Sequence, residues 1–172
     1  MIIFNYTINE ILDQSKIISL YRASTVLNED NKEALSILGL SERDVDILKK
    51  HLKNGCVKIA HILSGYTKDL VNKDYNSIPM EGDPFEFDVT YNETENSIVF
   101  RINMPESWPI SCATLIDVAI KDALENYVVY RINKDKGIDG TSYLDDFDVA
   151  CRDIRSYLGR RDTMVKRSYS FP

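Results

Sequence analysis

The sequence predicts a mainly α-helical fold, namely a helical bundle with an inserted β-hairpin and an extended C-terminal tail. Over most of the chain, apolar residues recur at spacings of three and four, which is typical of amphipathic helices. Only after Pro84 do they alternate with polar residues at the period of a strand. From residue 160 onward neither period is present. We therefore expect one domain over residues 1–159, a hairpin at about 84–104, and a tail over 160–172.

The first helix should begin at the capping box Thr7-Ile8-Asn9-Glu10. In such a box the side chains of the first and fourth residues each hydrogen-bond a backbone amide that the helix leaves without a partner. A polar stretch over 28–32 interrupts the apolar pattern, and a short helix from about Lys32 to Leu38 is expected to follow. The N-terminal third of the chain is therefore predicted to be helical.

The clearest helix follows a second capping box, formed by Ser41 and Asp44. Gly55 lies inside this helix at a cost of up to about 1 kcal/mol relative to alanine, unless a neighbour must approach closely there. Gly65 is expected to end it. Its apolar residues fall on one stripe: Val45, Leu48, Leu52, Cys56, Ile59 and Leu63.

The predicted hairpin has one apolar face. Its turn is the polar stretch 92–96. The residues that should share this face are Phe85, Phe87, Val89 and Tyr91 on the first strand, and Ile98, Phe100, Ile102 and Met104 on the second. A hairpin alone is only marginally stable in water. It must therefore pack on the helices or join a sheet that another copy supplies.

Two helices are expected after the hairpin. The first runs from about Cys112 to Ile132, where Leu115, Val118, Ala119, Leu124 and Tyr127 have broadly helical spacing. Val128 and Tyr130 make its end apolar on more than one side, which indicates burial between elements or at a subunit contact. After a turn over 136–140, Thr141 or Ser142 should cap the last helix, which Gly159 ends.

The C-terminal tail is basic, whereas the rest of the chain is acidic. Residues 160–172 contain four basic residues and one acidic residue, Asp162, so their net charge is +3. The whole chain has a net charge of −6, and the residues before 160 therefore carry −9. The tail also holds apolar side chains that it cannot bury alone. The candidate contacts with a subunit or partner are Tyr127, Val128, Tyr130, Arg160, Arg161, Lys166, Arg167, Tyr169 and Phe171.

Composition excludes several classes of protein. No apolar run approaches the roughly 20 residues that span a bilayer, and the first residues lack the basic leader of a signal peptide. We therefore expect an intracellular protein without membrane contact. The three cysteines are widely spaced and form no CxxC motif, so neither a disulfide framework nor a zinc ribbon is predicted. An acidic body also argues against specific nucleic-acid binding.

No catalytic, cofactor or metal site is predicted. His51 and His61 lie about 15 Å apart along one helix, which excludes a shared ion, and both are expected at the surface or its boundary. The chain has no nucleophile elbow and no glycine-rich phosphate loop. An acidic cluster of Asp145, Asp146 and Asp148 fits a solvated helix start, although paired carboxylates also serve acid–base work.

Two stretches together resemble a known family. The first contains Leu40-Ser41-Glu42-Arg43-Asp44 and the helix end Ile62-Leu63-Ser64-Gly65-Tyr66-Thr67. The second contains Trp108-Pro109, then Ala123-Leu124-Glu125-Asn126-Tyr127-Val128-Val129-Tyr130-Arg131, and then the spaced residues Tyr143, Phe147, Ala150, Arg152, Ile154, Arg155 and Leu158. This order resembles the head-to-tail adaptor or ring proteins of tailed bacteriophages. The resemblance spans roughly residues 40–70 and 105–160.

The resemblance implies a structural virion protein rather than an enzyme. It implies a homo-oligomeric ring, of twelve copies, in the neck below the portal protein, with DNA passing through the lumen and other neck or tail rings as neighbours. Such a protein would be assembled in the host cytoplasm and located at the portal vertex of the virion. Two alternatives stay open: a small intracellular adaptor or regulatory domain that binds one protein partner, and an enzyme that uses Asp145, Asp146 and Asp148.

Overall fold

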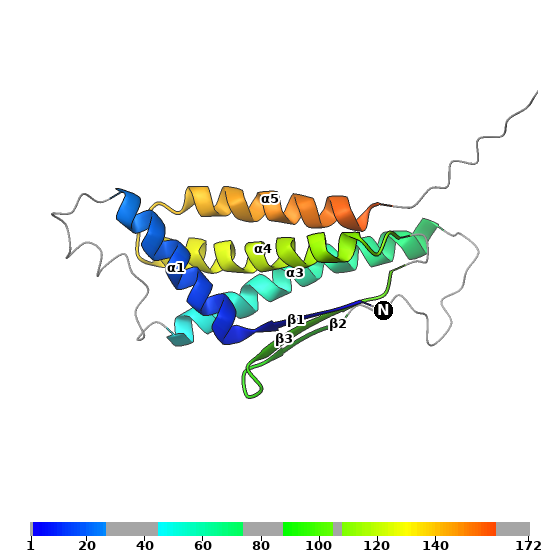
Figure 1. Ribbon diagram of the computed structural model, residues 1–172, viewed down its shortest axis with the longest axis horizontal. Helices are drawn as coiled ribbons and strands as arrows, with labels where there is room; N and C mark the ends of the chain where they lie inside the picture. Colours follow the sequence, from blue (N-terminus) through cyan, green and yellow to red (C-terminus); the bar gives the residue numbers. More distant parts are fainter. Residues whose placement is uncertain (1, 27–44, 74–87, 105–107, 161–172) are drawn as a thin grey trace, which may run out of the picture.

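The computed structural model describes residues 2–26, 45–73, 88–104 and 108–160 (Figure 1). In chain order the elements are β1 (Ile2–Thr7), α1 (Ile8–Val26), α3 (Val45–Lys73), β2 (Asp88–Asn92), β3 (Ser97–Ile102), α4 (Cys112–Asp135) and α5 (Thr141–Leu158). The mainly α-helical fold with a β-hairpin is confirmed. The short helix predicted at Lys32–Leu38, the capping box at Ser41 and Asp44, and the tail beyond residue 160 lie outside the described residues.

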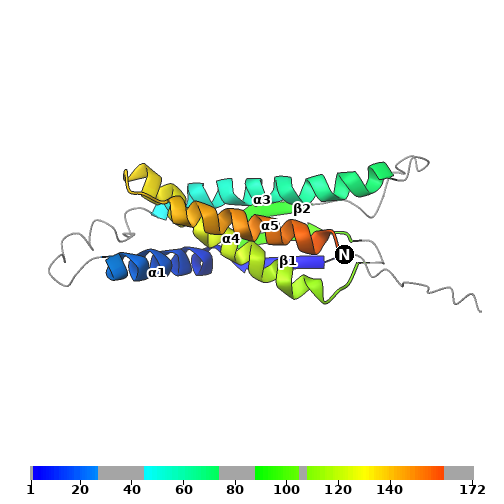
Figure 2. The same cartoon turned by 90° about the horizontal axis from the view of Figure 1, so that it is seen from above.

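The centre of the fold is α4, which contacts α1, α3, α5 and β1. On one side of it lies α5, which seen from above runs between α3 and α4 (Figure 2). The sheet packs on the other side, against α1, α3 and α4 (Figure 1). Because α4 has neighbours on several sides, its second half is buried on more than one side. Tyr127 and Val128 are therefore buried by the chain's own helices, which cover the apolar excess without a second copy.

The sheet has three strands, because the N-terminal residues form β1 and complete it. All pairs are antiparallel, in the order β1-β3-β2. Register places Phe4 of β1 and Val89 of β2 on either side of Phe100, so the apolar side chains share the face toward the helices. Tyr6 meets Phe100 edge-on at 6.0 Å between ring centres. The hairpin predicted at about 84–104 is confirmed over residues 88–102, and the sheet is completed by a third strand from the same chain. Phe85 and Phe87, which were expected on its apolar face, lie outside the described residues.

The first helix is capped by the hairpin and not by its own sequence. The backbone N–H of Ile8 donates to the carbonyl of Asn96 at 3.1 Å, and that of Asn9 donates to the Oδ1 of Asn96 at 3.1 Å. Asn96 adopts a left-handed conformation with φ of 53°, which asparagine tolerates in tight turns. Glu10 instead pairs with Lys121 of α4 at 2.6 Å. The expected capping box is therefore wrong, although the helix begins where it was predicted.

The long helix α3 continues past Gly65 to Lys73, so Gly65 does not end it. Gly55 inside the same helix has a packing reason. A Cβ at this position would lie 3.0 Å from Cδ1 of Tyr127 and 3.5 Å from Leu124. The missing side chain lets α3 and α4 approach closely, and the neighbour that needs the space is an aromatic ring.

The turn between α4 and α5 is closed by Asp139. Its Oδ1 accepts hydrogen bonds from the backbone N–H of Thr141 at 2.9 Å and from the Thr141 hydroxyl at 2.6 Å, which lowers the pKa of Asp139. The residue at the helix start is Gly140, and neither Thr141 nor Ser142 caps the helix as predicted. At the other end, Trp108 Nε1 donates to the carbonyl of Tyr157 at 2.9 Å. This bond ties the end of α5 to the segment before α4.

Candidate functional site

The predicted contact residues are divided among three environments. Tyr127 and Val128 are core residues, with 3% and 0% of their surfaces exposed. Tyr130 is partly buried beside the Tyr127 ring, at 6.4 Å between centres. Arg160 is exposed, and its guanidinium lies 5.0 Å from the centre of the Tyr157 ring. The other five lie outside the described residues: Arg161, Lys166, Arg167, Tyr169 and Phe171.

The histidine prediction needs a correction. His51 is buried, with 4% of its surface exposed, and its Nε2 lies 2.7 Å from Oδ2 of Asp135 at the end of α4. It therefore links α3 to α4 and does not lie at the surface. His61 is exposed, as expected. Within the described ranges no three His, Cys, Asp or Glu side chains converge on a point where they could hold a metal ion.

The acidic cluster on α5 is split between two sides of the helix. Asp145 and Asp148 line a groove between α5 and α3, whereas Asp146 lines a second groove between α5 and α4. This division follows from the 100° rotation per residue of an α-helix. Asp145 and Asp148 therefore share one groove, Asp146 lies in the other, and α5 separates two surface depressions with different linings.

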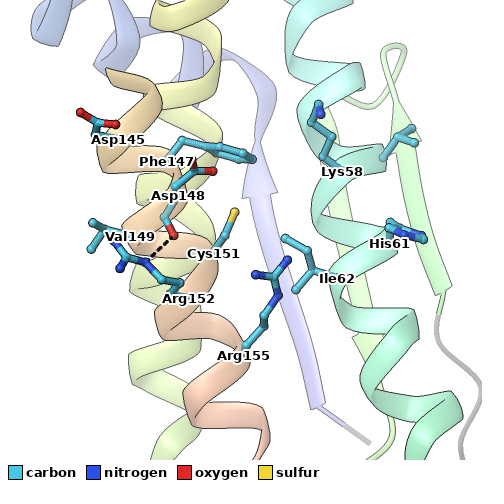
Figure 3. A pocket seen from close by; sticks show the side chains of 11 residues that line it. Lys58, His61, Ile62, Asp145, Phe147, Asp148, Val149, Cys151, Arg152 and Arg155 are labelled. Atoms are coloured by element: carbon cyan, nitrogen blue, oxygen red, sulfur yellow. Dashed lines mark hydrogen bonds between the residues drawn. The ribbon is translucent and has the colours of Figure 1, made fainter. Parts of the chain in front are cut away.

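The larger depression, called here the α3–α5 groove, has a volume of about 880 Å³ and is open to solvent. Figure 3 shows the charged side chains at its edges, with Lys58 and His61 on α3, and Asp148, Arg152 and Arg155 on α5. Its apolar lining consists of Val57, Ile62, Phe147, Val149 and Cys151. Cations outnumber carboxylates around this groove, so it suits an acidic ligand or the acidic surface of another molecule.

The cysteine in this groove is not a nucleophile at neutral pH. Burial raises the pKa of Cys151 to about 11, against the opposing effect of Arg155. Only 3% of its surface is exposed. Burial likewise raises the pKa of Cys56 on α3, which is not among the residues that line this groove, to about 12. Because the thiolate is the reactive form, both thiols serve as small apolar core groups.

The smaller depression, called here the α4–α5 groove, has a volume of about 350 Å³. Asp122 of α4 and both Asp146 and Asp153 of α5 line it, and none of its lining residues is basic. Its other lining residues are Leu115, Val118, Ala119, Asn126, Val149, Ala150 and Tyr157. Partial desolvation raises the pKa of Asp122, which Lys121 opposes. The groove therefore combines apolar contact area with negative charge.

Three apolar side chains in the α4–α5 groove are exposed. The exposed fractions are 43% for Leu115, 53% for Val118 and 45% for Val149, which lies on the ridge that both grooves share. The sequence predicted helical spacing for Leu115 and Val118 but not which side chains pack, and the structure buries Ile116 and Ile120 instead. The signal was present, because an all-round apolar helix must leave some side chains outside a small core.

In the described ranges no helix is both long enough and apolar enough to cross a bilayer. No protein-family model, no curated protein and no solved structure matches this chain. The function is therefore inferred from the two grooves, from the charge distribution and from the family resemblance of the sequence described above.

Proposed function

We propose that this protein is a non-catalytic structural component that assembles with copies of itself into a ring in the head-to-tail connector of a tailed phage. DNA would pass through the lumen of the ring. The observation that carries the proposal is the α4–α5 groove, where exposed apolar side chains and three carboxylates share one helical face. A chain with a complete core of its own exposes such a patch when another protein surface covers it.

The chemistry of the side chains supports a binding role. Burial raises the pKa of the Cys56 and Cys151 thiols, and Asp146 lies on the other side of α5 from Asp145 and Asp148. The depressions on both sides of α5 are open to solvent, which suits contact with a protein surface.

The charge distribution supports a ring around DNA. A body with a charge of −9 repels phosphate, so a duplex would slide past it without being held. In a closed ring every copy contacts its two neighbours through two different surfaces, one on each side. The acidic α4–α5 groove and the basic tail are two such surfaces on one chain.

Imaging of intact virions tests the proposal directly. We expect density for multiple copies of this chain, arranged as a ring between the portal protein and the tail. A matched preparation that lacks the gene should give filled heads that fail to join tails. Absence of the chain from purified particles, with normal joining in the deletion preparation, would refute the proposal.

The α3–α5 groove favours a second candidate, an adaptor that binds one protein partner. Lys58, Arg152 and Arg155 would attract an acidic surface to this groove. An adaptor of this kind would remain a single copy in its complex. Native mass spectrometry of the chain isolated from its source separates the two functions, because one copy per complex supports the adaptor and many copies support the ring.

A further inference from the structure

We infer that the α4–α5 groove of one copy receives the C-terminal segment, residues 161–172, of a neighbouring copy. The identity of the neighbour rests on the proposed function, but the recognition between groove and segment does not. The groove is a surface on the described part of the chain, and the segment is a stretch of the same sequence outside it.

Charge complementarity is the first argument. The groove presents the carboxylates of Asp122, Asp146 and Asp153 and has no basic side chain among its lining residues. The segment carries three cations, Arg161, Lys166 and Arg167, against the single carboxylate of Asp162. The α3–α5 groove on the other side of the helix has the opposite bias, so it would repel the segment. Of the two grooves, only the α4–α5 groove has the sign that attracts a basic segment.

Apolar matching and length are the second argument. Met164, Val165, Tyr169 and Phe171 follow one another within eight residues of the segment. In an extended conformation the stretch from Met164 to Phe171 spans about 23 Å. The groove follows α5 from Asp146 to Tyr157, which is about 16 Å along a helix. The segment is therefore long enough to cover the exposed Leu115, Val118 and Val149 along the whole groove.

The direction of the chain is the third argument, and it favours a neighbour over the same copy. The backbone N–H of Gly159 donates to Arg155 and that of Arg160 donates to Tyr157, so the chain leaves α5 in the helix direction. The groove lies behind this exit, alongside the residues that precede Tyr157. To enter its own groove the segment would have to reverse at once beside the stacked Arg160 and Tyr157. A copy placed ahead receives the segment without a reversal, and repetition of this contact builds a head-to-tail ring.

Recognition is tested with a fluorescent peptide of residues 161–172 and the chain ending at Arg160. The described core is complete at Leu158, so the shortened chain retains it. We expect saturable binding by fluorescence anisotropy, weakened at least about tenfold by Asp122→Lys with Asp153→Lys. The matched control, Asp145→Lys with Asp148→Lys, changes the α3–α5 groove and should leave binding unchanged or tighter. No saturable binding, or equal loss in both variants, would overturn the inference.

A charge swap distinguishes specific pairing from damage to the fold. A peptide carrying Arg161→Glu, Lys166→Glu and Arg167→Glu should fail to bind the chain with wild-type carboxylates. It should bind the chain carrying Asp122→Lys and Asp153→Lys, because the signs are then complementary again. Failure of this rescue, while circular dichroism shows both chains folded, counts against the groove as the site.

Cross-linking in the full chain decides between a neighbour and the same copy. Val118→Cys places a thiol in the groove, and Tyr169→Cys places one in the segment, while Cys56, Cys112 and Cys151 are buried. Mixed singly substituted chains should form a disulfide between the two different chains under mild oxidation. A doubly substituted chain that closes only on itself, or no cross-link in either preparation, overturns the assignment to a neighbour. Virions without a ring, combined with peptide binding in the groove, would refute the proposed function and not the recognition.

Discussion

The two grooves on either side of α5 differ in what lies beneath them and in the charge at their edges. The lining of the α3–α5 groove includes core side chains, because Phe147 and Cys151 are buried and Phe147 packs on Tyr127 at 5.2 Å between ring centres. The α4–α5 groove also reaches the core, but only at the small side chains of Ala119 and Ala150, and its larger aliphatic side chains, such as Val118, are exposed. The first groove therefore borders a large aromatic core side chain, whereas the second borders the core only at two alanines.

This difference separates stability from recognition on a single helix. Residues of the α3–α5 groove hold α3, α4 and α5 together, so their removal should affect folding. Exposed residues of the α4–α5 groove make few contacts within the chain, so their removal should affect only the binding of another surface. The predictions below test this division, beginning with the largest expected effect.

Truncation of Phe147 should be the most damaging change. Phe147→Ala removes a buried ring that packs on Tyr127, which should lower the free energy of unfolding by about 3 kcal/mol or more. The matched change in the other groove, Val118→Ala, should alter it by no more than about 0.5 kcal/mol. Urea unfolding followed by circular dichroism measures both. Similar losses in the two variants would break the distinction between the grooves.

Thiol reactivity should differ by about a hundredfold between the two surfaces at pH 8. The raised pKa of Cys151, about 11, leaves little thiolate, whereas an exposed thiol at Val118→Cys should ionise near its ordinary value. Timed alkylation followed by peptide mass spectrometry reports each site separately. In urea the rates should become similar, because unfolding removes the burial. Fast alkylation of native Cys151 would mean that the floor of the α3–α5 groove is open.

Two carboxylates one turn apart on α4 should respond differently to pH. Burial between α4 and α1 raises the pKa of Glu125 to about 7, aided by Asp122 and Glu10 and opposed by Lys121. Between about pH 4.5 and pH 7 the folded chain therefore holds a proton that the unfolded chain releases. The contribution of Glu125 to the free energy of unfolding is fully present below about pH 4.5 and is lost as the pH rises through 7.

Replacement of Glu125 should remove this pH dependence. Glu125→Gln should stabilise the chain relative to wild type by roughly 1 to 3 kcal/mol at pH 8 and much less at pH 5. Asp122→Asn, in the exposed α4–α5 groove, should change the free energy of unfolding relative to wild type by less than about 0.5 kcal/mol at either pH. Thermal or urea unfolding at the two pH values measures both variants. An equal stabilisation at pH 5 and pH 8 would contradict burial of the charged form.

Several elements could be predicted because their signals are local. The hairpin was found from the alternation around Phe100, and the existence and C-terminal end of α5 were found from its periodic apolar residues and from Gly159. The strand β1 was missed because it pairs with β3, which lies almost a hundred residues away in the sequence. The true cap of α1 was missed for the same reason, since Asn96 reaches it only after the sheet forms.

The candidate site was predicted only in part. The acidic body, the basic tail and the apolar excess of α4 were visible in the sequence, but the residues that form the α4–α5 groove were not. Leu115 and Val118 have the spacing of a core stripe, and they are exposed because α1, α3 and α5 cover other sides of α4. Periodicity gives the relative angles of side chains on a helix, but not which of those angles neighbouring elements cover.

The sequence by itself determined the helices, the hairpin and the opposite charges of body and tail, because each depends on residues close together in the chain. Only the tertiary structure decided that β1 completes the sheet, that Tyr127 and Val128 are core residues, and that the carboxylates of α5 belong to two surfaces. Burial depends on which elements meet in space, and contacts between distant segments form together when the chain folds.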